Sequence, residues 1–307
     1  MIGILSADPK SAIIKKGDNM ESEKRIYQDN VVNKISDRGG GLFRCPTYLL
    51  DSVRRLMVRD GDLSLLGDYV IVGLGGGFDV LPQLLEDASE VSGYARTIKT
   101  YTGSFRGIEV SVIAMGGGLI YAEWAVALAY MKKVKALVGV GWCGALQESI
   151  KIGDAVIPTA AMRDENASTH YVDHDFPAIS NPELMAMAIE EVRPRLERMG
   201  SKLWLGITVT TSAMLAETPE RVEKWKKQRA LCVDGETSVI YTLSYLGNIP
   251  SLVLLAVSDN VILGEDCGFG TELSERVDRT FRELAKGTLE ILERLRRSEE
   301  NQTLDLK

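Results

Sequence analysis

Residues 232–260 read CVDGETSVIYTLSYLGNIPSLVLLAVSDN and contain a helix pattern followed by a strand pattern. Apolar side chains recur with helical spacing over residues 237–246, and a glycine and a proline follow them, which predicts a helix that ends there. Residues 251–257 are mostly apolar, which predicts a buried strand. This strand leads into Asp259, and ligands bind at the carboxyl ends of strands in open α/β sheets. The stretch therefore predicts an α/β fold with a ligand site at this strand end.

Two acidic residues precede the predicted helix. Asp234 and Glu236 are two positions apart and flank Gly235. Glu236 and Asp259 lie on consecutive elements, so their carboxylates can converge on one pocket. A pair of carboxylates in one pocket is typical of general acid–base chemistry or of binding to hydroxyl groups.

The composition limits the class of protein. The chain has 307 residues, is 45% apolar and carries a net charge of −7, so it can bury a large core and is unsuited to nucleic acid as its main partner. No apolar run is long enough to span a bilayer, and the first residues lack the pattern of a secretory signal. We therefore expect a cytoplasmic protein with no membrane partner.

The cysteines and histidines do not indicate a metal site. The four cysteines are far apart in the sequence and form no CxxC pair, and only two histidines are present, namely Cys45, Cys143, Cys232, Cys267, His170 and His174. Zinc sites use closely spaced ligands of these types. We expect no metal, and we expect the cysteines to stay reduced.

A glycine-rich loop follows the first predicted strand. Residues 68–73 predict a buried strand, Gly75, Gly76 and Gly77 come next, and a helix is expected over residues 80–86. Backbone N–H groups at a helix start can hold an anion. A glycine-rich loop alone is a weak signal, and the alternative is a tight connection without a ligand.

The stretch 232–260 resembles a segment of the nucleoside phosphorylase/nucleosidase superfamily, which reads V-E-M-E, then a helix, then a strand ending in V-S-D. The resemblance implies that Glu236 holds the ribose hydroxyls and that Asp259 protonates N7 of a departing purine. It also implies that Ser258 lies beside the base. The chain departs from the family at Asp234, where Glu is usual, and at Gly235, where a Met usually packs under the sugar.

Other segments carry the same resemblance over residues 68–295. The run RDENASTHYVDHDFPAISNPEL from Arg163 resembles the phosphorylase R-x-D-G-x-S pattern and implies that Tyr171 stacks on the base. By the same resemblance, Met214 lies beside the base or sugar and Met115 beside the ribose. For Met214, an ordinary core position is the equally weighted alternative.

The phosphate site is where the chain departs most from the family. The resemblance implies phosphate contacts from Gly75, Gly76 and Gly116, and from Arg96 reaching across a dimer interface. By this resemblance, Gly139 replaces the Arg that grips phosphate in the family, and Trp142 replaces the Thr or Ser that hydrogen-bonds the phosphate. A buried dianion needs compensating positive charge, and the nucleosidase branch also lacks these Arg residues.

The resemblance implies a three-layer α/β fold with a mixed, partly barrel-like central sheet flanked by helices. It divides the chain into an N-terminal extension without an assigned role (1–66), a nucleoside phosphorylase-like domain (67–297) and a tail (298–307). A site completed by Arg96 implies a homodimer or a trimer of dimers. No organic cofactor is implied, and phosphate is expected as a co-substrate.

Three functions stay open at this point. The first is phosphorolysis of a purine nucleoside or uridine in nucleoside salvage, giving free base and ribose 1-phosphate, with Lys99 assisting the phosphate. The second is a phosphate-independent nucleosidase, in which Asp79 would activate water. The third is a non-catalytic nucleoside-binding protein.

Overall fold

The computed structural model describes residues 42–268 and 270–305. The chain divides into two compact units, residues 1–52 and 53–307. Helix α2 (Thr47–Met57) runs through the division between them. The prediction of an extension over residues 1–66 falls largely outside the described residues and stays a prediction.

The second unit is built on one mixed sheet. The described strands form an eleven-stranded sheet in the order β11-β10-β6-β8-β9-β5-β1-β4-β3-β2, with β7 paired to β6. Their bounds are β1 Tyr69–Gly73, β2 Glu86–Glu90, β3 Ile98–Phe105, β4 Ile108–Met115, β5 Ala136–Ala145, β6 Ala155–Asp164, β7 Ala178–Ile179, β8 Leu203–Thr211, β9 Cys232–Asp234, β10 Ser251–Asn260 and β11 Glu265–Asp266.

One part of this sheet closes on itself. Strand β10 pairs with β6 and also, in parallel, with β5. Strands β8 and β9 connect β6 to β5 on the other side. The five strands therefore form a closed ring, which confirms the prediction of a partly barrel-like sheet.

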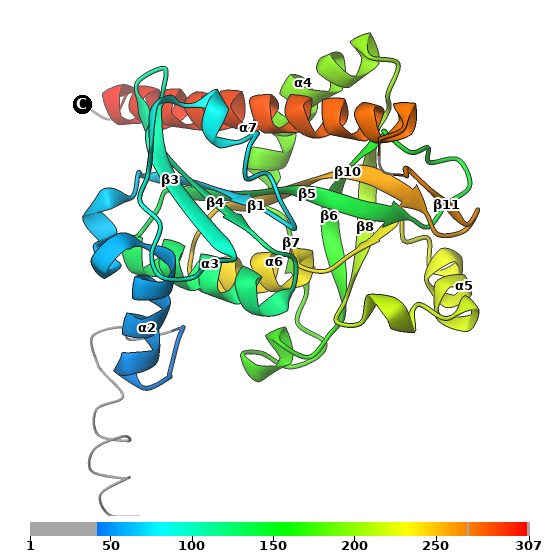
Figure 1. Cartoon of the computed structure of the whole chain (residues 1–307), viewed down its shortest axis with the longest axis horizontal. Coiled ribbons are helices and arrows are strands. Elements are labelled where there is room, and N and C mark those ends of the chain that lie inside the picture. The colour runs from blue at the N-terminus through cyan, green and yellow to red at the C-terminus, as the bar shows by residue number, and fades with distance from the viewer. Residues whose placement is uncertain (1–41, 269, 306–307) are drawn as a thin grey trace, which may run out of the picture. The chain divides into compact units, whose positions relative to one another are not determined.

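Helices cover both faces of the sheet in Figure 1. Helices α4 (Pro182–Arg198) and α7 (Glu272–Asp305) pack together on one face, and α3 (Leu119–Lys132) and α6 (Thr237–Leu246) pack together on the other. Helix α5 (Pro219–Lys227) begins after Thr218, whose side chain accepts a hydrogen bond from the Arg221 amide. The three-layer α/β fold is confirmed.

The described chain also has short 3-10 helices, and their bounds are Arg59–Gly61, Leu63–Leu65, Pro82–Leu84, Ser168–His170 and Met214–Ala216. No helix among residues 42–268 and 270–305 is long and apolar enough to cross a membrane.

The continuous apolar runs of the sequence form strands that are covered on both faces. All five residues of β1 are buried, as are the first seven of β10. Both strands have helices over each face, so they need apolar side chains on both sides. Phe281 and Leu284 of α7 pack into the same cluster as Leu254 of β10. Residues 251–257 thus lie in the core of the second unit.

One predicted element differs from the structure. The helix expected over residues 80–86 is wrong: only the short 3-10 turn at Pro82 forms, and β2 begins at Glu86. Proline lacks an amide hydrogen and restricts the residue before it, which opposes a longer helix. The tail expected over residues 298–307 stays a prediction, and α7 continues through residue 298 to Asp305. An ion pair one turn apart, Arg296–Glu300, bridges this extension.

Candidate active site

Glu236 lies immediately before α6 and points toward the loop after β4. Its Oε1 accepts a hydrogen bond of 2.5 Å from the Gly118 amide. A side chain at Gly117 would approach the same oxygen to 3.1 Å, so the backbone of this loop lies close to the Glu236 carboxylate. Only 7% of Glu236 is exposed. Glu236 and the glycine loop of residues 116–118 thus form one wall of the candidate site.

Burial changes the acidity of this carboxyl. Removal from water and, to a smaller extent, the nearby charge of Asp234 together raise the pKa of Glu236 to about 7, although the amides of Gly118 and Gly235 act in the opposite direction. Glu236 therefore changes its charge near neutral pH.

Asp234 has a structural role that the sequence did not reveal. Its Oδ2 accepts a hydrogen bond of 3.0 Å from the Thr237 amide at the start of α6. Its Oδ1 accepts one of 2.7 Å from the Thr210 hydroxyl on β8. Burial raises the pKa of Asp234 to about 6. The first acid of the pair therefore holds the helix start, and the second faces the glycine loop.

Asp259 lies over β5, near the end of β10. It is in register with Gly144, and a methyl group on Gly144 would lie 2.6 Å from its Oδ2. The Ser258 hydroxyl donates a hydrogen bond of 2.7 Å to Oδ1. Burial raises the pKa of Asp259 above its usual value, which favours the protonated form that a general acid needs.

Glu217 is a second carboxyl near Asp259 that the sequence did not indicate. Burial raises its pKa, and the charge of Asp259 adds to this effect, whereas Arg221 opposes it. Glu217 follows the short helix Met214–Ala216, in which Met214 is 72% exposed. No sequence pattern marks Glu217, because its nearness to Asp259 is set by the tertiary fold.

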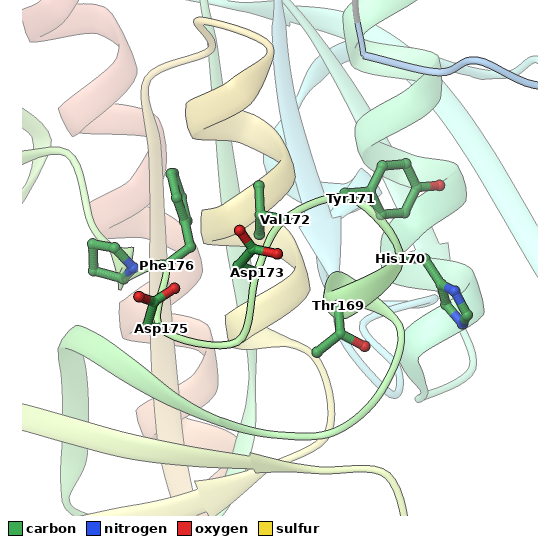
Figure 2. A pocket seen from close by; sticks show the side chains of 8 residues that line it. Thr169, His170, Tyr171, Val172, Asp173, Asp175 and Phe176 are labelled. Carbon is green, nitrogen blue, oxygen red and sulfur yellow. The ribbon is translucent and has the colours of Figure 1, made fainter.

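The loop between β6 and β7 presents Tyr171. Arg163 organises this loop through hydrogen bonds of 2.8 Å to the Ser168 hydroxyl and 2.7 Å to the Asp173 carbonyl. In Figure 2, Tyr171 projects from the loop at the opposite side of the pocket from Phe176. The Tyr171 hydroxyl donates a hydrogen bond to Glu123 of α3. The described residues lining this pocket include Tyr171 but neither Glu236 nor Asp259.

The buried part of the loop is joined to α6. Glu165 accepts hydrogen bonds from the Ser168 amide at 3.0 Å and from the Ser238 hydroxyl at 3.0 Å. Ser238 is two residues after Glu236, so the loop with Tyr171 and the wall with Glu236 share a hydrogen-bonded support. The sequence did not predict this connection.

The other expected ribose residues lie around the same glycine loop. Met115 is completely buried at the end of β4, where it bridges to Gly76, and Gly116 follows it. Gly235 is half-buried, and a side chain added there would meet nothing within 4 Å. The position of the family's Met is therefore open space.

The residues expected to bind phosphate lie on separate segments of the chain. Gly75 is exposed and Gly76 is buried in the loop after β1, whereas the Arg96 side chain is exposed in the turn before β3. Lys99 pairs with Glu90 at 2.6 Å. Asp79, the expected base of the hydrolytic alternative, is exposed.

Trp142 of β5 packs against the glycine loop. A side chain on Gly76 would lie 2.5 Å from Cη2 of its indole, and one on Gly75 would lie 3.6 Å from Cε3. The indole stacks on Phe281 with ring centres 4.7 Å apart and planes at 14°. The loop expected to hold an anion is therefore in contact with an aromatic ring.

The arrangement defines a class of protein: an α/β fold with a partly closed sheet, a buried carboxylate at the start of a helix and a half-buried carboxylate near the end of a strand. A sequence model of the phosphorylase superfamily matches residues 69–295. The chain belongs to this superfamily.

Similar proteins carry nucleoside phosphorylase names. A guanosine phosphorylase from Halorubrum lacusprofundi is 26% identical and covers 74% of this chain and 94% of its own length. A DeoD-type purine nucleoside phosphorylase from Caldanaerobacter subterraneus is 31% identical over 69% of this chain and 88% of its own. A crystal structure of uridine phosphorylase from Vibrio fischeri ES114 superposes with a TM-score of 0.68, at 21% identity, over 75% of this chain and 94% of that one.

Proposed function

We propose that this protein cleaves the N-glycosidic bond of a nucleoside and releases the free base. The observation that carries the proposal is a pair of carboxylates, the buried Glu236 on the Gly118 amide and the half-buried Asp259 over Gly144. The names of its relatives, guanosine phosphorylase and purine nucleoside phosphorylase, support cleavage of the same bond.

Each carboxylate has a separate role in the proposed reaction. Glu236 accepts hydrogen bonds from the 2′- and 3′-hydroxyls and holds the ribose as positive charge develops on it. Asp259 gives its proton to the departing base, and its raised pKa keeps that proton available. A purine fits this role because its N7 accepts the proton. Tyr171, Met214 and Ser258 are proposed to lie along the base, and Met115 and Gly235 along the ribose.

Two acceptors for the sugar are candidates. With phosphate, the product is ribose 1-phosphate, and Gly75, Gly76, Gly116 and Arg96 of a second copy would hold the anion. This candidate is supported by the phosphorylase names of the relatives. Water is the second candidate, and the contact between Trp142 and the glycine loop favours it. Neither acceptor requires a metal or organic cofactor.

The test is release of free base from inosine, adenosine, guanosine and uridine, each with and without phosphate. The proposal predicts release from at least one purine nucleoside. Purified Glu236→Ala protein, prepared identically, reports contaminating activity. Absence of release from all four nucleosides under both conditions would contradict the proposal and favour a protein that only binds nucleosides.

A further inference from the structure

We infer that Trp142 determines the acceptor: its indole occupies the space over the Gly75–Gly76 loop, excludes inorganic phosphate and leaves water to react with the sugar. This inference rests on the proposed bond cleavage and decides between its two acceptors.

The first argument is the contact between the ring and the loop. The indole lies so close to the backbone that a methyl group on Gly76 would overlap Cη2 at 2.5 Å. Gly76 itself is buried, and its backbone bridges to Met115. An anion held by this loop on its Trp142 side would need the volume that the indole fills.

The second argument is that the ring is held in place. It stacks on Phe281 of α7, which is 2% exposed. A side chain on Gly77 would lie 3.2 Å from Cζ of Phe281. The loop, the indole and the phenyl ring thus pack as a continuous stack, and moving Trp142 aside would leave a cavity against α7.

The third argument concerns charge. Around Gly139, a side chain would first meet Leu74 at 3.0 Å, Val253 at 3.1 Å and Ile240 at 3.4 Å. This surrounding is apolar and has no room for a cation at position 139. A phosphate dianion there would lose its hydration without gaining an ion pair from β5, which is strongly unfavourable.

The indole also lies near the glycine loop of residues 116–118, which contacts Glu236. A side chain on Gly117 would lie 3.7 Å from Cα of Gly75 and 3.1 Å from Oε1 of Glu236. Gly75 therefore lies between the indole and the loop that contacts Glu236. A water molecule needs far less space than phosphate and carries no charge, so it can approach the sugar where the dianion is excluded.

The hydrolytic step balances as follows. The C1′–N bond breaks, and the base leaves with the bonding electrons and the proton from Asp259. The water oxygen forms the new bond to C1′, and one of its protons passes to solvent. Asp259 then takes a proton from solvent. The products are free base and ribose, with no change of oxidation state.

The experiment compares wild type with Trp142→Ser and Trp142→Phe. Phosphate binding is measured directly by equilibrium dialysis with radiolabelled phosphate, and base release is measured with and without phosphate. Trp142→Ser removes the ring and supplies a hydroxyl. Trp142→Phe keeps an aromatic ring against the loop, so it is the matched control.

We expect wild type and Trp142→Phe to show no saturable phosphate binding and no stimulation by phosphate. In Trp142→Ser, phosphate should stimulate base release by about tenfold or more, the factor given by about 1.4 kcal/mol, and ribose 1-phosphate should appear. Wild type that binds phosphate, or that needs it for base release, would overturn the inference while supporting the proposed function.

The remaining outcomes are also decisive. If Trp142→Ser does not fold, the wild-type measurements alone decide whether phosphate is excluded. If none of the proteins releases base, the proposed function fails, and dialysis still shows whether removing the indole opens a phosphate site. A folded Trp142→Ser protein without phosphate binding or stimulation would contradict the role of the ring.

Discussion

The two sides of the candidate site differ in chemistry: one carries hydrogen-bonded carboxylates, and the other is aromatic and apolar. On the carboxylate side, the buried Glu236 accepts a hydrogen bond from the Gly118 amide, and the half-buried Asp259 accepts one from the Ser258 hydroxyl. On the side of the first glycine loop, the neighbours are the Trp142 indole and the apolar surroundings of Gly139. The same fold can thus keep carboxylates suited to binding a sugar and a base, while the glycine loop expected to bind an anion packs against hydrophobic side chains.

The difference indicates which side supplies the proposed chemistry. Buried polar groups without partners cost free energy, so polar residues are retained where they are satisfied. The glycine loop has no side chains to pair, and the Trp142 ring packs against its backbone. We therefore expect substitutions on the carboxylate side to reduce activity and a substitution at Trp142 to change the acceptor.

Replacement of Glu236 should give the largest effect. Glu236→Ala removes the acceptor for both ribose hydroxyls and should lower base release by a factor of about 10²–10⁴, because hydrogen bonds to charged groups contribute about 1.5–3 kcal/mol each. Glu236→Gln keeps one acceptor oxygen without the charge and should fall between wild type and Glu236→Ala. Steady-state kinetics with a purine nucleoside provides the measurement. Wild-type kinetics in Glu236→Ala would remove this residue from the mechanism.

Displacement of Asp259 should give the next largest effect. In Gly144→Ala the new methyl group would lie 2.6 Å from Oδ2, so the carboxylate must move. Since a displacement of about 1 Å can cost about 10²-fold in rate, we expect a loss of about 10–100-fold. The melting temperature separates this effect from loss of the fold.

A double variant tests whether Gly144 acts through Asp259. Gly144→Ala should lower the rate of wild type but cause little further loss in Asp259→Asn, because the displaced acid is already absent. Equal losses in both backgrounds would mean that the methyl group disturbs something other than the acid.

The sequence predicted the elements whose patterns are local. The helix Thr237–Leu246 and the strand Ser251–Asn260 follow directly from apolar spacing and from the glycine and proline between them. The resemblance also predicted the partly closed sheet. The helix expected after the glycine loop did not form, because the pattern ignored the effect of Pro82.

The details of the site depend on contacts between distant segments. The sequence singled out Glu236 and Asp259, and their roles stay predictions. It could not show that Asp234 holds the start of α6, since that role depends on Thr210 of β8. It identified Trp142 as a departure from the family but not its stacking on Phe281, because no local pattern relates β5 to α7.

The pH dependence of stability should give the smallest effect. The pKa of Glu236 rises from 4.5 to about 7 on folding, so the folded protein binds more protons than the unfolded chain between these values. Its contribution to the free energy of unfolding is complete below pH 4.5 and is lost as pH rises through 7. The loss proceeds with a slope of up to about 1.4 kcal/mol per pH unit.

Glu236→Gln separates this contribution from that of its neighbour. The variant cannot titrate at position 236, so its stability should vary less between pH 6 and 7 than that of wild type. Asp234, with a pKa raised to about 6, contributes a slope of the same sign mainly below pH 6. Urea unfolding at several pH values measures both slopes. An unchanged slope between pH 6 and 7 in Glu236→Gln would mean that Glu236 is already ionised in the folded protein, so that the amides of Gly118 and Gly235 outweigh its burial.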